Sequence, residues 1–134
     1  MVNPLPIAIT TDEKRFLMES AVLMRDSGRL DQAAVMFEAI VSLVDDRHLP
    51  LIGLGSVEFE RGAFERAVER FEDAVAFAPD CALAHAHLGE ALAFSRHLEE
   101  AQLALRKATE LDPAGTAGGN MARQIQKFLD YGLL

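Results

Sequence analysis

Residues 64–79 read FERAVERFEDAVAFAP, and residues 98–113, which begin 34 positions later, read LEEAQLALRKATELDP. In both segments the apolar residues recur at steps of three and four, which is the spacing of one face of an α-helix, whereas a strand would alternate at every second residue. Both segments end in proline, which cannot continue a helix. A fixed period of this length indicates an array of repeated helical units.

The same period of 34 residues extends toward the N-terminus without an insertion. Two columns hold only small residues and one holds only bulky ones, and small side chains are what a close contact between helices requires. We therefore expect the alanines of the second column to lie at helix contacts, so that Ala67→Leu or Ala101→Leu would overpack the core. The columns are Ala21, Gly55 and Gly89; Ala33, Ala67 and Ala101; Phe37, Phe71 and Leu105; and Ile40, Ala74 and Ala108.

Each unit predicts two helices joined by a short turn. Gly28 and Gly62 follow a first helix and can adopt the left-handed conformation that ends one, whereas Arg96 occupies the matching place in the third unit. Thr10 and Glu13 have the spacing of a capping box that would start the first helix. The first helices are predicted near 12–27, 48–61 and 82–95, and the second helices near 30–44, 64–77 and 98–111.

The two ends of the chain are interpreted separately. Residues 1–11 are predicted to be extended, and we expect residues 4–9, stiffened by two prolines, to dock into an apolar groove, the alternative being a disordered leader. Residues 114–134 are predicted to form a loop and a helix near 120–131. Its apolar face would shield the last repeat from water, unless the segment is a loosely attached tail.

The aligned columns resemble the tetratricopeptide repeat over residues 14–113. The resemblance implies an all-α fold, a right-handed superhelical stack of three helix pairs at about 14–47, 48–81 and 82–113, followed by a C-terminal capping helix. The first helices would line a concave groove. Residues 28–33 (GRLDQA), followed by Phe37, and residues 51–55 (LIGLG) further resemble the tetratricopeptide chaperones of bacterial type III secretion, which hold translocator or needle proteins before export.

The family geometry implies a set of groove residues on the first helices. Relatives that clamp the carboxylate of a heat-shock protein use lysines and asparagines there, and this sequence has none at the matching places. The implied ligand is therefore a protein or extended peptide with apolar anchors. The implied groove residues are Arg15, Met18, Val22, Arg25, Leu49, Ile52, Ser56, Phe59, Leu83, Ala86, Glu90 and Phe94.

Within this set the expected roles differ. Phe59 and Phe94 are the favoured anchors, because an aromatic ring offers a large contact area at a small entropic cost. Arg15 and Arg25 could meet an acidic group of the ligand or could be ordinary solvated charges. Any apolar member could pack between repeats instead of facing a ligand.

Composition excludes several classes of function. Thirteen basic against twenty-one acidic residues give a formal charge of −8 without a basic cluster, so we expect no nucleic-acid partner. The apolar N-terminus is too short for a secretory core or a membrane span. The single cysteine, Cys81, cannot form an internal disulfide, and we interpret it as buried filler in a cytoplasmic protein.

The residue types of catalysis and metal binding are not gathered into a motif. His85 and His87 are two residues apart and would point to different faces of a helix, so no metal site is predicted. There is no phosphate-binding glycine loop and no nucleophile motif. We therefore predict neither an enzyme nor a cofactor.

Two functions remain open. The first is a cytoplasmic chaperone that holds a secreted client, of the type III secretion translocator or needle type, in an apolar groove. The alternative is a scaffold or assembly subunit that joins folded partners in a larger complex. A homodimer is compatible with both.

Overall fold

The computed structural model describes residues 8–134, which form seven helices and no strand. Every predicted helix is present, and each predicted end lies within one residue of the observed end, which confirms the all-α fold class. The helices are α1 (Thr11–Asp26), α2 (Leu30–Leu43), α3 (His48–Glu60), α4 (Phe64–Phe77), α5 (Ala82–Phe94), α6 (Leu98–Leu111) and α7 (Gly119–Asp130).

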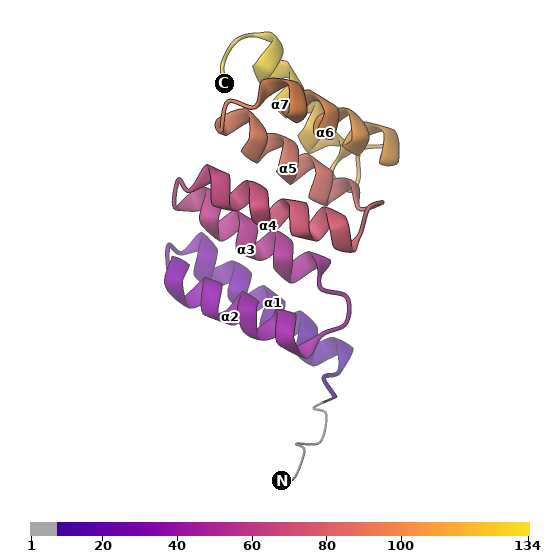
Figure 1. Ribbon diagram of the computed structural model, residues 1–134. Coiled ribbons are helices and arrows are strands. Elements are labelled where there is room, and N and C mark those ends of the chain that lie inside the picture. The colour runs from indigo at the N-terminus through magenta and orange to yellow at the C-terminus, as the bar shows by residue number, and fades with distance from the viewer. Residues whose placement is uncertain (1–7) are drawn as a thin grey trace.

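The helices form a right-handed superhelical stack of antiparallel pairs. Figure 1 shows α1–α2, α3–α4 and α5–α6 following one another in chain order, with α1 and α7 at opposite ends of the stack. Helix α7 packs against both α5 and α6, as the predicted cap requires. Each pair can bury its apolar face only against its neighbours, so the fold is continuous from end to end.

The first helix begins at the predicted capping box. The Glu13 backbone N–H donates to the Thr10 side-chain oxygen at 3.1 Å, and the Thr10 backbone N–H donates to Glu13 Oε1 at 3.3 Å. Two of the backbone donors that a helix start leaves unpaired are thereby satisfied.

The turn inside each repeat uses one left-handed residue. Gly28 and Gly62 have φ values of 84° and 77°, and Arg96 takes the same conformation at 68° although it carries a side chain. The residue after Gly28 closes the turn, because the Arg29 N–H donates to the Met24 carbonyl at 2.8 Å. The three positions that align in sequence thus share the same left-handed backbone conformation.

The repeats are joined where a phenylalanine ring of a second helix contacts the following first helix. A Cβ atom added to Gly53 of α3 would lie 2.3 Å from the ring of Phe37 of α2, so only glycine leaves room for this ring. His87 of α5 occupies the position 34 residues later, and its ring stacks on Phe71 with the ring centroids 5.2 Å apart and the planes at 23°. We call these two contacts the inter-repeat joints.

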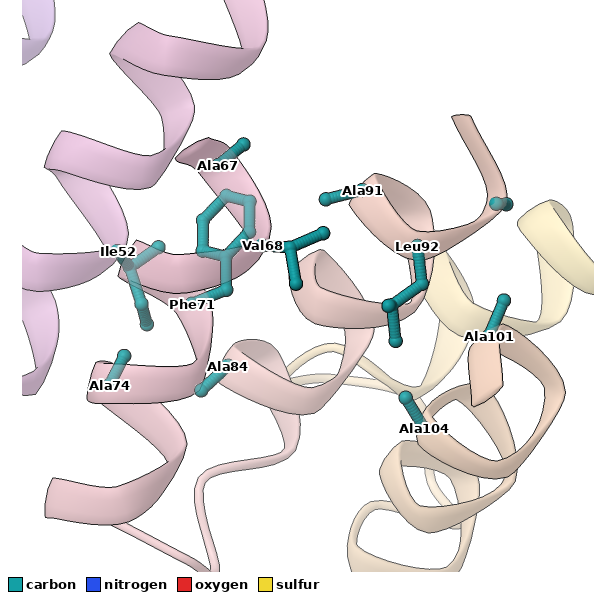
Figure 2. Close-up of a cluster of buried hydrophobic side chains, with 11 residues drawn as sticks. Ile52, Ala67, Val68, Phe71, Ala74, Ala84, Ala91, Leu92, Ala101 and Ala104 are labelled. Atoms are coloured by element: carbon teal, nitrogen blue, oxygen red, sulfur yellow. The ribbon is translucent and has the colours of Figure 1, made fainter. Parts of the chain in front are cut away.

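The core between the second and third repeats contains the predicted alanine column. Ala67 and Ala101 have no exposed surface, which confirms that they lie at close helix contacts. The largest side chain of this cluster is the ring of Phe71, which is fully buried. Figure 2 shows the side chains of this cluster, which come from α3, α4, α5 and α6.

The loop before α7 is held by one carboxylate, Asp112. Its oxygens accept N–H bonds from Gly115 at 3.2 Å, Ala117 at 2.6 Å and Gly119 at 2.9 Å. These bonds, those from Ala117 and Gly119 first, lower the pKa of Asp112 from its ordinary value. The carboxylate therefore fixes both the loop and the first turn of the capping helix.

Candidate functional site

The predicted groove residues lie on α1, α3 and α5, and most of them keep some exposed surface. Arg15, Leu49 and Phe94 are exposed. The half-buried members are Met18, Val22, Arg25, Ser56, Phe59, Leu83 and Glu90.

Two of the predicted groove residues belong to the core instead. Ile52 is 6% exposed and packs in the cluster around Phe71, and Ala86 is 0% exposed. Ala86 lies in a cluster with Ala122 and Ile125 of α7. Neither side chain is available to a ligand in this structure, because neighbouring helices approach these two positions closely.

Three aromatic rings form a cluster across the second and third repeats. The ring centroids are 5.1 Å apart for Phe59 and Phe64, 5.0 Å for Phe59 and Phe94, and 5.1 Å for Phe64 and Phe94. The first two pairs are edge to face, which is a favourable geometry for aromatic side chains. Phe94 is 39% exposed, so the cluster presents apolar surface on a well-packed base.

Phe64 is a member of this cluster that the sequence analysis did not identify. It is the first residue of α4 and so lies outside the first helices, from which the groove residues were chosen. Its place in the chain, directly after the turn at Gly62, is the signal that could have found it, since that turn returns the chain beside the end of α3.

Carboxylates flank the aromatic cluster. Glu90 precedes Phe94 by one helical turn and therefore lies on the same side of α5. Burial raises the pKa of Glu90 from its ordinary value, and the nearby charge of Glu60 adds to the shift. This part of the surface is thus apolar and negative.

The two predicted groove arginines already have partners on their own helix. Arg15 Nη1 lies 3.8 Å from Asp12 Oδ1, and Arg25 Nε lies 3.0 Å from Asp26 Oδ1. Such exposed pairs contribute little to stability. A role for either arginine in binding an acidic group stays a prediction.

His87 is half-buried between repeats. Burial lowers its pKa to about 4, and the positive charge of Arg25 acts in the same direction. The ring is therefore neutral at neutral pH and serves the joint with Phe71. His85 has a different partner, since its Nε2 lies 2.7 Å from the Pro79 carbonyl oxygen.

Residues 8–134 contain no group of three or more His, Cys, Asp or Glu side chains that could hold a metal ion. No helix in this part of the chain is long and apolar enough to cross a bilayer. Cys81 is half-buried rather than fully buried, because it precedes the first turn of α5 instead of lying inside the helix.

The predicted docking of residues 4–9 falls largely on residues 1–7, which lie outside the described part of the chain. Ile9 is described, and it is half-buried against the cluster of the first repeat that contains Ala21 and Phe37. Docking of the whole segment stays a prediction.

Comparison with known proteins supports the repeat assignment. The tetratricopeptide repeat profile matches residues 58–125. The Arabidopsis thaliana protein named CTR9 homolog is 30% identical over 93 residues, which is 68% of this chain. The chain spans only 8% of the length of that relative.

Two solved structures share the fold over nearly the whole chain. PcrH from Pseudomonas aeruginosa has a TM-score of 0.80 at 19% identity, and the match covers 95% of this chain and 96% of PcrH. The Yersinia enterocolitica type III secretion chaperone SycD, in complex with a peptide of the translocator YopD, has a TM-score of 0.78 at 20% identity and coverages of 91% and 93%.

Proposed function

The chain belongs to the tetratricopeptide repeat family, and from this premise we propose that it is a non-catalytic chaperone that binds an extended segment of a secreted protein. The client is of the translocator type that type III secretion systems export, and binding takes place in the cytoplasm before export. The segment lies along α1, α3 and α5 and places an apolar side chain on the aromatic cluster of Phe59, Phe64 and Phe94.

The aromatic cluster is the observation that carries this proposal. A peptide that covers Phe94 buries apolar surface on rings that the fold already holds in place, so little side-chain entropy is lost on binding. The likeness to SycD, which is solved with a translocator peptide, supports the client class. The sequence lacks the lysines and asparagines of a carboxylate clamp, which supports apolar anchoring.

The test begins with identification of the client and of the segment that binds. Affinity capture with the full chain would be followed by overlapping peptides of the captured protein, and the tightest peptide would be titrated by calorimetry. We expect an apolar segment that binds in an unfolded state. A scaffold would be favoured instead if a folded partner co-purified stoichiometrically and none of its peptides bound.

Phe94→Ala then tests the site, and Phe77→Ala is the matched control. Phe77 is 47% exposed and ends α4, away from the aromatic cluster, so both variants remove a partly exposed ring at a helix end. Loss of a central anchor weakens binding by about ten- to a hundredfold, and Phe77→Ala leaves it unchanged. Ile52→Ala is not a useful probe because Ile52 is in the core. Equal binding by wild type and Phe94→Ala would exclude the cluster as the anchor site.

A further inference from the structure

We propose that copies of this chain associate head to tail, with one face of α1 of one copy seated in the groove between α6 and α7 of another. This contact lies at the two ends of the stack and uses neither the aromatic cluster nor the groove residues predicted on α1, so it goes beyond the proposed function.

The face of α1 in question is exposed and largely apolar at its centre. Phe16 is 68% exposed and Leu23 is 70% exposed, and Glu19 lies between them on the same side of the helix. Asp12 and Asp26 continue this line at the two ends. The line runs on the side opposite Ala21, the buried residue of α1.

The 34-residue period identifies the equivalent face of the first helix in the other two repeats. The positions 34 residues after Phe16, Glu19 and Leu23 are Pro50, Gly53 and Val57, and all three are buried in α3. Gly53 is the residue on which the ring of Phe37 sits. In α5 the matching position is His87, which stacks on Phe71. The same face is therefore an interface with the preceding second helix in two repeats, and among residues 8–134 no helix precedes α1.

The groove at the other end has a basic rim, and its base is closed by two buried apolar residues. It encloses about 580 Å³ between α6 and α7, with Leu105 and Ala122 as buried lining residues. The rim cations are Arg106, Arg123 and Lys127.

None of these cations makes an ion pair with another residue in the range 8–134. Arg123 donates instead to the Asn120 side chain and to the Pro113 carbonyl. The one carboxylate of the lining, Asp130, accepts a hydrogen bond from Gln126. The groove is therefore a positive site on a chain whose net charge is −8.

The charges of the two ends favour a second copy as the occupant. Asp12 and Asp26 each pair with an arginine of α1, but Glu19 makes no ion pair with the described residues, and it lies between the two exposed apolar side chains. Phe16 and Leu23 would pack on the aliphatic stems of the exposed lining side chains while Glu19 meets their charged ends. Because the two surfaces lie at opposite ends of one molecule (Figure 1), each contact leaves a free end for another.

Sedimentation velocity of the full chain tests the proposal. Wild type is expected to form dimers and longer species as its concentration rises, and to dissociate when ionic strength increases from about 0.1 M to about 1 M, which shortens the screening length from about 10 Å to about 3 Å. Wild type that stays monomeric at every concentration would overturn the proposal.

Two double variants identify the surfaces. Phe16→Asp with Leu23→Asp changes the α1 face, and Arg106→Glu with Lys127→Glu changes the groove. All four side chains are exposed, so thermal melts should show that both variants fold. Each variant alone is expected to be monomeric. As a control, Arg29→Glu with Lys107→Glu makes the same charge change at exposed positions outside the groove and should associate as wild type does.

An equimolar mixture of the two double variants separates head-to-tail association from a symmetric dimer. The intact α1 face of the groove variant can enter the intact groove of the α1 variant, so the mixture should form a heterodimer that grows no further. A symmetric α1 dimer would instead persist in the groove variant. That result, or a mixture that does not associate, would contradict the proposal.

Discussion

Arg96 adopts a backbone conformation that glycine adopts in the two preceding repeats. A residue with a Cβ atom pays about 1–2 kcal/mol for the left-handed region, because the Cβ approaches the following carbonyl oxygen. The third repeat therefore carries a local strain that the first two do not.

We predict that Arg96→Gly raises the free energy of unfolding by about 0.5–1 kcal/mol, the relief of strain being partly offset by the greater freedom of glycine in the unfolded chain. Urea denaturation measures this. Gly62→Ala at the matching turn is the control and should lower the free energy of unfolding. Arg96 also lines a small pocket with Leu133 and Leu134. A less stable Arg96→Gly variant would show that these contacts outweigh the strain.

The alanines at the helix contacts leave no room for a larger side chain. We predict that Ala67→Leu lowers the free energy of unfolding by about 1–3 kcal/mol through overpacking, because Ala67 is fully buried. Ala76→Leu is the matched control on the same helix, where the side chain is exposed, and it should change little. Equal melting temperatures for both variants and wild type would mean that the core adapts without cost.

At the scale of helices, α1 and α5 differ in how far they are buried. Only Ala21 is buried among the 16 residues of α1, whereas eight of the 13 residues of α5 are buried. Opening α1 therefore exposes much less apolar surface than opening α5.

Hydrogen exchange should reflect this difference. We predict that the backbone amides in the middle of α1 exchange faster than those in the middle of α5 under native conditions, because α1 can open without unfolding the stack. Mass spectrometry of the exchanged chain resolves the two helices, provided that the sample is dilute enough to prevent association. Equal protection would show that the chain unfolds only as one unit.

The helices themselves could be predicted from the sequence because their signals are local. The apolar spacing, the capping box at Thr10 and the turn glycines each act within a few residues. The loop before α7 could not be predicted in the same way. Asp112 was not identified, because its role depends on N–H groups that the folded loop turns toward it.

The candidate site was predictable only in part for a similar reason. Family geometry implies which side of a first helix would face a ligand, and Phe59 and Phe94, the two expected anchors, lie in contact in one cluster. It does not show how closely a neighbouring helix approaches. Ala86 is covered in the cluster with α7, and the direction of α7 depends on the loop after α6 rather than on the repeat.

At the scale of the molecule, His87 links the stability of the stack to pH. Its pKa is about 4 in the folded chain and about 6.5 in the unfolded chain, so the unfolded state binds more protons between these values. The stabilisation that the neutral His87 ring provides is therefore fully present above pH 6.5 and is lost as the pH falls toward 4. The raised pKa of Glu90 has the opposite sign and offsets part of this loss near the lower limit.

We predict that the free energy of unfolding falls by about 1–2 kcal/mol between pH 7 and pH 5. Urea denaturation at the two pH values measures this, and in His87→Leu the decrease should be smaller. Asp112 and Asp46, whose pKa values are lowered, act mainly below pH 4 and do not affect this comparison. A decrease of the same size in His87→Leu would assign the pH dependence to other groups.

The inter-repeat joints determine which insertions and deletions keep the packing between repeats. Phe37 and Phe71 occupy equivalent positions of successive repeats, and so do their contact partners Gly53 and His87. Excision of residues 48–81 as one block would bring Phe37 to His87, a pairing of the same kind as the one that Phe71 makes. Duplication of that block would likewise place Phe71 on a second copy of Gly53. Gain or loss of whole 34-residue blocks thus preserves the joints, whereas an insertion between Phe37 and Gly53, or between Phe71 and His87, changes the number of residues between that ring and its partner.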